Sequence, residues 1–360
     1  MAGLIAAALA PLIAAAAETS LPATPEAFGQ ALKAWAAEHR ITRAFVVVRR
    51  EGRIVHRSAL GGANPDAPVH LASLSKAITA ACVATLVRDG KLGFGTPISS
   101  ALQRFIAAHG KARDPRLAGV TVGQLLTHHA GFAVSDDDDP ASGRNLDRYL
   151  ETHSSRAPPG PALLAATLKA KLVQAPGARF AYGNAGYFVL GGIIEEASGR
   201  PFASYCGDAV LKPRGIAADL EPAWRVLSSM GGWRMRAEDY LKFLELFAAD
   251  DERLGAAVKS WMLDRAGKSV PFDPAVWYGL GTYLRTAEPG IDAWHWGSWD
   301  YTPDAGEKGT VRTSFAAYAK RLSDGTAWFV HVEPRVEEGA LRAALDRALM
   351  EAYRAVKSWD

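Results

Sequence analysis

Several features are scarce or missing in this chain of 360 residues. It contains only two cysteines, Cys82 and Cys206, which favour two buried thiols, with a disulfide left open if the protein is exported. The net charge is only +3, and Lys and Arg are scattered among nearly as many acidic residues, so no basic stripe favours nucleic acid. A Gly-x-Ser-x-Gly elbow is absent, which argues against an ordinary α/β-hydrolase.

The composition favours a large packed core. About half of the residues, 49%, are hydrophobic, which is enough for one or two domains.

Residues 1–17 are almost entirely Ala, Leu and Ile and end at small residues, which predicts an export signal and a periplasmic protein. This stretch has no Lys or Arg before its apolar run, so a buried N-terminal helix stays the alternative. No later segment is long and apolar enough to span a bilayer, so no stable membrane span is expected.

The apolar patterning predicts a sheet with a helical insertion, together forming one domain over residues 25–357. Strand-like runs occur near both ends of the chain, and an amphipathic helix follows the last of them at 336–357. Helical spacing dominates the middle. The predicted sheet part is therefore about 25–72 with 275–357, and the helical part is about 73–274. The strand-like runs are 43–50, 53–58, 277–286, 311–320 and 326–333, and the helical runs are 73–89, 162–173, 185–198 and 236–248.

Ser73 and Lys76 form the first chemical motif. They lie three residues apart where an apolar helix begins, so both fall on one helical face and the amine can reach the hydroxyl. A free lysine has a pKa of about 10.4, but burial and the positive end of a helix both lower it. The interpretation is a serine nucleophile activated by lysine. The competing interpretation is a helix-capping serine with a solvated lysine.

Tyr182 and Asn184 form the second motif. The chain has only three asparagines, and one of them lies two residues after a tyrosine in a Gly-containing turn before a helix. A phenol near a cationic lysine is expected to titrate low enough to act as general base toward Ser73 and then as acid toward the leaving group. The Asn184 amide can orient Lys76 and bind a substrate carbonyl. The competing interpretation is a buried tyrosine in a turn.

The third motif runs from His295 through Trp296 and Gly297 to Ser298. The segment could be a strand at a sheet edge, where Gly297 lets a substrate approach the backbone. The Ser298 N–H could then pair with the Ser73 N–H as an oxyanion hole. His295 retains some ability to bind an anion when it is protonated. Taken alone, this motif is more typical of a packed aromatic cluster.

With these motifs in this order, the chain resembles the serine hydrolases related to penicillin-binding proteins and class C β-lactamases. That group includes D-alanyl-D-alanine carboxypeptidases, D-aminopeptidases and carboxylesterases. The resemblance covers about residues 30–350 and rests on further runs as well. These runs are Thr121 to Gly131, Tyr182 to Gly199, Gly231-Gly232 with Asp239, and Trp277 to Gly281.

The resemblance implies roles for the motif residues and a fold. Ser73 would be the acylated nucleophile, Lys76 and Tyr182 the proton-transfer pair, and Asn184 a substrate-orienting amide. His295 would take the position where lysine is usual in β-lactamases, and residue 298 would supply the second oxyanion N–H. The implied fold is a β-lactamase/transpeptidase-like α/β (α+β) fold, in which an antiparallel sheet is flanked by helices. The mechanism requires no cofactor or metal.

The departures from the family pattern bear on the substrate. The third motif lacks the lysine that commonly anchors a carboxylate, and Trp296 replaces a hydroxyl residue, which weakens the lactamase interpretation. We therefore expect an esterase or amidase acting on small esters or amides. A D-alanyl-D-alanine carboxypeptidase, a D-aminopeptidase-like peptidase or a weak β-lactamase is the alternative, and a catalytically silent cell-wall-binding relative is another. The sequence leaves the exact substrate and the oligomeric state open.

Two further clusters favour structural interpretations. His128 and His129 are adjacent, so in a helix they would not share a face for a metal ion. The run Asp136 to Asp139 lacks the spaced ligands and the glycine of a calcium loop, and it lies in a stretch, 133–161, that reads as an exposed loop.

Overall fold

The structure is a computed structural model, and it describes residues 20–134, 141, 160–220, 228–301, 313–336 and 339–360. The predicted export signal lies outside these residues, and so do the run Asp136 to Asp139 and most of the expected loop at 133–161. The described part contains no helix that is both long enough and apolar enough to cross a membrane.

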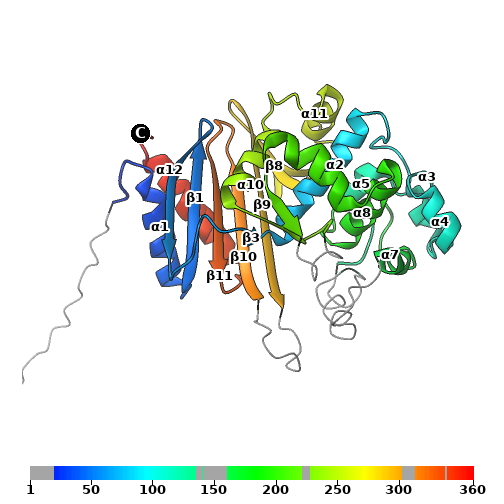
Figure 1. Ribbon diagram of the computed structural model, residues 1–360, viewed down its shortest axis with the longest axis horizontal. Coiled ribbons are helices and arrows are strands. Elements are labelled where there is room, and N and C mark those ends of the chain that lie inside the picture. Colours follow the sequence, from blue (N-terminus) through cyan, green and yellow to red (C-terminus); the bar gives the residue numbers. More distant parts are fainter. Residues whose placement is uncertain (1–19, 135–140, 142–159, 221–227, 302–312, 337–338) are drawn as a thin grey trace, which may run out of the picture.

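An eight-stranded antiparallel sheet forms the frame of the molecule (Figure 1). Its spatial order is β2-β1-β11-β10-β9-β8-β7-β6, so strands from the two ends of the chain meet at the β1–β11 pair, where Val46 lies opposite Val330. The strands are β1 (Arg43–Arg50), β2 (Arg53–Leu60), β6 (Ser269–Val270), β7 (Asp273–Gly279), β8 (Thr282–Ala287), β9 (Gly290–Tyr301), β10 (Thr313–Arg321) and β11 (Ala327–Glu333).

Helices cover both faces of the sheet. On one face α1 (Glu26–Glu38) packs with α12 (Gly339–Ala355), and on the other lies the helical region (Figure 1). Along β1, Val46 and Val48 belong to the core under α1 and α12, whereas Phe45 and Val47 belong to the core under the helical region. Burial on both faces explains the unbroken apolar run of this strand.

The helical region lies between β2 and β6 in the chain. This part of the chain also forms a small three-stranded sheet in the order β3 (Val69–His70), β5 (Trp233–Met235) and β4 (Ala218–Leu220). Its helices are α2 (Ser75–Arg88), α3 (Ile98–Ala101), α4 (Gln103–His109), α5 (Val122–Leu126), α7 (Gly160–Leu168), α8 (Ala185–Ser198), α9 (Phe202–Cys206), α10 (Ala237–Phe243) and α11 (Ala256–Leu263). Short helical turns are η1 (Ala72–Leu74), η2 (Pro115–Gly119), η3 (Gly207–Leu211), η4 (Lys212–Arg214) and η6 (Leu244–Phe247).

Two expectations need correction. The run at 277–286 is not one strand, because Leu280 and Gly281 take positive φ angles of 50° and 77° and turn the chain from β7 into β8. The two cysteines are not free thiols, since Cys82 of α2 and Cys206 of α9 form a disulfide. Their Cα atoms lie 5.4 Å apart, within the usual range for a disulfide, because α2 and α9 pack against each other.

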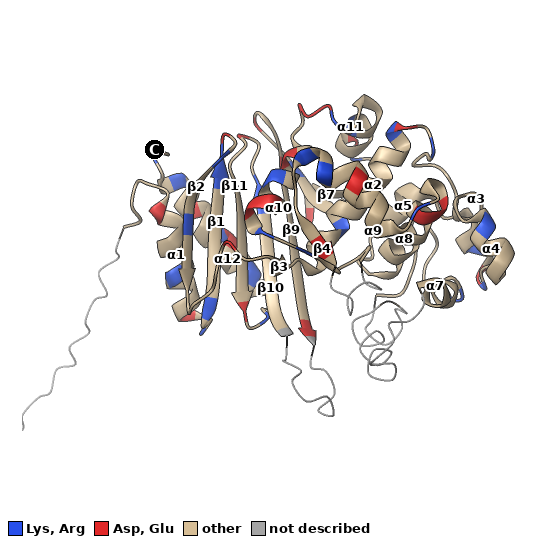
Figure 2. Ribbon diagram, viewed as in Figure 1, with Lys and Arg blue, Asp and Glu red and all other residues tan. Residues whose placement is uncertain are grey.

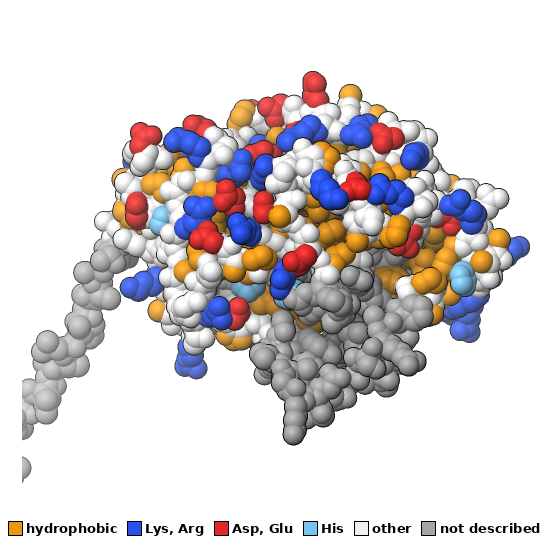
Figure 3. All heavy atoms as spheres, in the orientation of Figure 1, with side chains coloured by type: hydrophobic (Ala, Val, Ile, Leu, Met, Phe, Trp, Pro, Cys, Tyr) orange, Lys and Arg blue, Asp and Glu red, His pale blue; other side chains and the backbone are white. Residues whose placement is uncertain are grey.

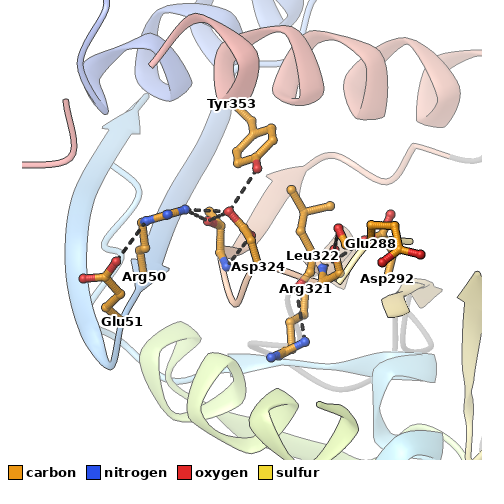
Figure 4. Close-up of polar contacts among 10 residues, drawn as sticks. Arg50, Glu51, Glu288, Asp292, Arg321, Leu322, Asp324 and Tyr353 are labelled. Atoms are coloured by element: carbon orange, nitrogen blue, oxygen red, sulfur yellow. Dashed lines mark hydrogen bonds and ion pairs between the residues drawn. The ribbon is translucent and has the colours of Figure 1, made fainter. Parts of the chain in front are cut away.

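A polar cluster fastens α12 to the sheet (Figure 4). The Asp324 carboxylate, in the turn between β10 and β11, pairs with Arg50 Nη1 at 2.6 Å and accepts a hydrogen bond from the Tyr353 hydroxyl at 3.0 Å. One carboxylate thereby joins β1, the β10–β11 turn and α12. Basic and acidic residues are interspersed along the helices and strands (Figure 2). They are also mixed over the molecular surface seen in Figure 3.

Candidate active site

Ser73 lies in the short turn η1, which runs directly into α2. The turn is strained, because its first residue, Ala72, has a φ of 46°, an angle that alanine rarely adopts. Ser73 does not cap a helix, since the N-cap positions of η1 and α2 are Leu71 and Leu74 and neither makes a side-chain capping bond. The interpretation of Ser73 as an ordinary helix cap therefore does not hold.

Lys76 lies one turn further on and is completely buried. Its Nζ donates hydrogen bonds to Ser73 Oγ at 2.9 Å, to Asn184 Oδ1 at 2.8 Å and to the Met230 carbonyl at 3.1 Å. A solvated surface lysine is thus excluded. The amine is held in contact with the hydroxyl that the sequence paired with it.

Asn184 reaches Lys76 from the start of α8, a helix that packs against α2. It is the N-cap residue of α8 but makes no capping bond with its side chain. Its Oδ1 accepts from Lys76 instead, so α8 fixes the amide against α2 and holds the lysine in place. The structure brings the first two motifs together as the sequence predicted.

Tyr182 also joins this cluster. Lys76 Nζ lies 5.1 Å from the centre of its ring. Burial raises the pKa of Tyr182 well above its usual value, although its interaction with the Ser73 hydroxyl and the charge of Arg342 pull it partly back. The expectation of a lowered phenol pKa was wrong, because burial outweighs the nearby cations. At neutral pH the phenol holds its proton close to Ser73.

The third motif lies on β9, beyond the point where β8 stops pairing with that strand. The last β8–β9 pairs include Tyr283 with Trp294, whereas β10 continues along β9 to Tyr301. Side chains alternate along a strand, so His295 and Gly297 face the helical region, while Trp296 and Ser298 face α12. Four consecutive motif residues are therefore divided between two faces of the sheet.

Gly297 lies directly against the nucleophile turn. A Cβ at this position would be 2.2 Å from the Leu71 carbonyl oxygen and 3.0 Å from the Ser73 nitrogen. Only glycine allows β9 to approach η1 this closely. The predicted pairing of the Ser73 and Ser298 N–H groups as an oxyanion hole stays a prediction.

His295 is a neutral group in this site. Its Nδ1 lies 2.5 Å from the Trp296 carbonyl, which can only accept, so Nδ1 carries the proton and Nε2 accepts from the Tyr278 hydroxyl at 3.0 Å. Burial lowers the pKa of His295 to about 3, and the charge of Lys76 adds to this effect. A protonated, anion-binding His295 is therefore contradicted at neutral pH.

The side chains of Trp296 and Ser298 lie on the face of β9 that packs against α12. The Trp296 ring stacks on Tyr318 with 4.1 Å between the ring centres. Ser298 Oγ accepts a hydrogen bond from Arg342 of α12 at 3.0 Å. The expectation that Trp296 binds substrate conflicts with this placement, since its ring packs under α12 on the face of β9 opposite His295.

Sequence reasoning missed several residues that shape the site. Tyr278 holds His295, the Met230 carbonyl accepts from Lys76, and the positive charge of Arg342 lowers the pKa values of Tyr182 and His295. Gly281 also matters, because a Cβ there would lie 2.4 Å from the Lys76 carbonyl oxygen. Tyr278 and Gly281 belong to a run that the resemblance already marked. Arg342 gave no sequence signal, since it is one of many charged residues on an amphipathic helix.

The described residues contain no group of three side chains suited to hold a metal ion. His128 and His129 are both buried, but their rings make different contacts. His128 packs on Tyr182, and His129 Nδ1 lies 2.7 Å from the Thr127 carbonyl.

A buried lysine that contacts a serine and an asparagine beside a tyrosine, where a sheet meets a helical region, defines a class of serine acyl-transfer enzymes. A sequence model of the β-lactamase family matches residues 28–313, and the chain belongs to this family. The predicted family and fold class are thereby confirmed. The chain is 31% identical to esterase EstB of Burkholderia gladioli over 207 residues, which are 52% of this chain and 48% of EstB. It is 25% identical to penicillin-binding protein 4 of Amycolatopsis lactamdurans over 187 residues, or 50% and 44% of the two chains.

The chain thus spans about half or less of the length of the curated relatives it matches. Among solved structures, a D-stereospecific amidohydrolase from Streptomyces sp. superposes with a TM-score of 0.71 at 20% identity. The match covers 91% of this chain and 97% of that one. This likeness shows the fold.

Proposed function

We propose that the protein is a serine hydrolase that forms an acyl-enzyme on Ser73 and acts on small esters or amides. The observation that carries this proposal is the completely buried Lys76, whose Nζ lies 2.9 Å from Ser73 Oγ. Burying an amine is costly unless its partners compensate, and three oxygens surround this one. So specific an arrangement is expected where the amine takes part in chemistry.

The contacts support the following order of proton transfers. In its neutral form, Lys76 accepts the Ser73 proton as Oγ attacks the substrate carbonyl, and we expect the oxygen that becomes negative to be held by the backbone N–H groups of Ser73 and Ser298. Tyr182 holds its own proton beside Ser73, so it donates that proton to the departing alcohol or amine. Lys76 returns its proton to Tyr182. Water then hydrolyses the acyl-enzyme with the same groups in reversed roles.

Because His295 of the third motif is neutral, the site favours an ester or amide substrate that carries no negative charge beside this residue. Lysine is the residue that commonly anchors a carboxylate at this position, and here a histidine with a pKa of about 3 replaces it. Both of its ring nitrogens are occupied by the Trp296 carbonyl and the Tyr278 hydroxyl. The β-lactamase interpretation is weakened further by this finding.

One observation favours a second candidate, a D-amino-acid-directed peptidase. Arg342 donates to Ser298 Oγ at 3.0 Å, and its charge lowers the pKa values of Tyr182 and Tyr283. The Arg342 side chain itself lies on the α12 face of β9, but its positive charge reaches the site and would favour a substrate that carries a carboxylate, such as a peptide.

A panel of acyl donors separates these candidates. The wild type and Ser73→Ala are each given a short-chain p-nitrophenyl ester, a fluorescent penicillin and a D-alanyl-D-alanine peptide. The proposal predicts Ser73-dependent turnover that is fastest for the ester. Release of D-alanine with little esterase activity would favour the peptidase, and wild-type esterase rates in Ser73→Ala would overturn the proposal.

We also propose that the protein is exported to the periplasm. The Cys82–Cys206 disulfide supports this proposal, because disulfides persist mainly in oxidising compartments. Fractionation of cells with the full chain, followed by mass measurement of the product, tests it. A cytoplasmic protein with an intact N-terminus and free thiols would contradict it.

A further inference from the structure

One buried histidine, His128, holds the backbone on both sides of Tyr182. Its carbonyl oxygen accepts a hydrogen bond from the Ala181 N–H at 2.8 Å, and its Nδ1 accepts from the Gly183 N–H at 3.4 Å. One peptide group on each side of Tyr182, Phe180–Ala181 and Tyr182–Gly183, is thus tied to a single residue that lies more than 50 positions earlier in the chain.

The backbone of His128 is itself held in an unusual conformation. It follows α5, whose start is fixed by reciprocal bonds between Thr121 and Gln124, and its φ of 58° lies in the left-handed region. Such an angle costs free energy in a residue other than glycine and persists only where the surroundings impose it. The turn directs both the carbonyl and the ring of His128 toward the 181–183 segment.

The ring of His128 lies against the tyrosines of the site. It is 4% exposed, and its centre is 4.4 Å from that of Tyr182, 4.7 Å from Tyr278 and 5.1 Å from Tyr187. Because Nδ1 accepts a hydrogen bond, the proton of the neutral ring is on Nε2, which is buried and has no partner among the described residues.

His128 is suited to this role only while it is neutral. Protonation of Nδ1 would set two N–H groups against each other and break the bond from Gly183. Burial lowers the pKa of His128 well below its usual value, and the charge of Lys76 lowers it further. The ring therefore remains an acceptor at neutral pH.

We propose that His128 is a positioning residue that holds the Tyr182 hydroxyl in line with Ser73 by fixing the backbone on both sides of this tyrosine. The inference rests on the proposed function, in which Tyr182 passes a proton to the leaving group. A shift of about 1 Å in a reacting group can cost about 100-fold in rate, so loss of this brace is expected to act on kcat.

Three variants test the proposal with p-nitrophenyl acetate as substrate. His128→Ala removes the acceptor, and His128→Asn keeps one, because Asn Oδ1 can occupy the place of His Nδ1 and asparagine tolerates a positive φ. His129→Asn is the matched control, since it makes the same change at the adjacent buried histidine, whose Nδ1 bonds the Thr127 carbonyl instead. For each protein kcat, KM, the melting temperature and the rate of Ser73 labelling by a fluorophosphonate are measured.

The expected result is a selective loss in His128→Ala. Its kcat and its labelling rate should fall by about 10- to 100-fold with KM nearly unchanged. His128→Asn should recover to within about threefold of the wild type, and so should His129→Asn. Across the variants, kcat and the labelling rate would then depend on whether residue 128 offers a hydrogen-bond acceptor, and not on the melting temperature.

Two results would overturn the inference. One is wild-type kcat and labelling in His128→Ala. The other is a loss in His128→Asn as large as in His128→Ala and proportional to the fall in melting temperature, which would mean that the histidine only stabilises the core. Failure of the proposed function itself looks different, because Ser73→Ala would then hydrolyse the ester at the wild-type rate.

Discussion

The two sides of the candidate site differ in charge and in what they supply. The helical side carries a buried amine, Lys76, enclosed by oxygens of Ser73, Asn184 and Met230. The strand side carries a neutral imidazole, His295, and a glycine that lets backbone approach backbone. Proton transfer is therefore assigned to the helical side. The strand side supplies shape and backbone donors, so equivalent substitutions on the two sides should have unequal effects.

The largest effect is expected from Lys76→Met on the helical side. Methionine fills much of the same space but cannot accept the Ser73 proton, and such proton transfer typically contributes about 100- to 10,000-fold in rate. We expect kcat/KM for a p-nitrophenyl ester to fall within that range. Lys91→Met, at an exposed lysine just after α2, is the control and should keep full activity. Equal activity in both variants would remove the distinction between the two sides.

The next largest effect is expected from Gly297→Ala on the strand side. The new methyl group would lie 2.2 Å from the Leu71 carbonyl oxygen, so β9 must move away from η1. Displacing one oxyanion donor typically costs about 100- to 1,000-fold in kcat. The control is Gly290→Ala on the same strand, where the nearest atom is an Ala249 side-chain carbon at 3.5 Å. Comparable kcat values for the two alanine variants would show that the close approach of β9 is not needed.

A smaller effect on rate is expected from His295→Gln. Because the histidine is neutral and both of its nitrogens face protein partners, we expect kcat/KM at pH 7 to fall by no more than about tenfold, less than a direct proton-transfer residue costs. A loss as large as that of Lys76→Met would show that His295 takes part in proton transfer.

The same variant has a larger effect on acid stability. The folded-state pKa of His295 is about 3, below the ordinary value near 6.5, so the unfolded chain binds a proton that the native protein does not. The stability from this group is present above about pH 6.5 and is lost as the pH falls toward 3, by up to about 3 kcal/mol at pH 4. His331 acts in the same direction, with its pKa also lowered to about 3 by burial. Thermal unfolding at several pH values should show a shallower acid loss in His295→Gln than in the wild type.

The smallest effect on activity is expected from Trp296→Phe. The ring stacks on Tyr318 on the face opposite His295, so turnover should stay within about twofold while stability falls by about 1 kcal/mol. Ester kinetics and thermal unfolding measure the two quantities. A marked rise in KM with an unchanged melting temperature would return Trp296 to the substrate site.

Local sequence patterns predicted the frame and the helical side well. The helix expected at 185–198 has the bounds of α8, and the strand-like runs expected at 43–50 and 53–58 form the paired strands β1 and β2. The pairing of Ser73 with Lys76 was predicted correctly, because residues three positions apart on a helix lie on the same face. Such features depend on residues close together in the chain.

The strand side was predicted less well, because the roles of its side chains depend on residues that are distant in the sequence. The alternation of β9 was foreseeable, but which face would meet Ser73 depended on packing against η1 and α12. The pKa values of Tyr182 and His295 depended on burial that no short motif reports. The Cys82–Cys206 pairing likewise required the packing of α2 on α9, which joins segments 124 residues apart.

The most direct test of the account is intact-protein mass spectrometry after brief incubation with a fluorophosphonate and, separately, with a p-nitrophenyl ester. We expect one covalent adduct per chain that maps to Ser73. This adduct should be absent from Ser73→Ala and should form far more slowly in Lys76→Met, yet at a similar rate in His295→Gln. An adduct on another residue, or equally fast labelling of Ser73 in Lys76→Met, would contradict the claim that the buried lysine of the helical side activates this serine.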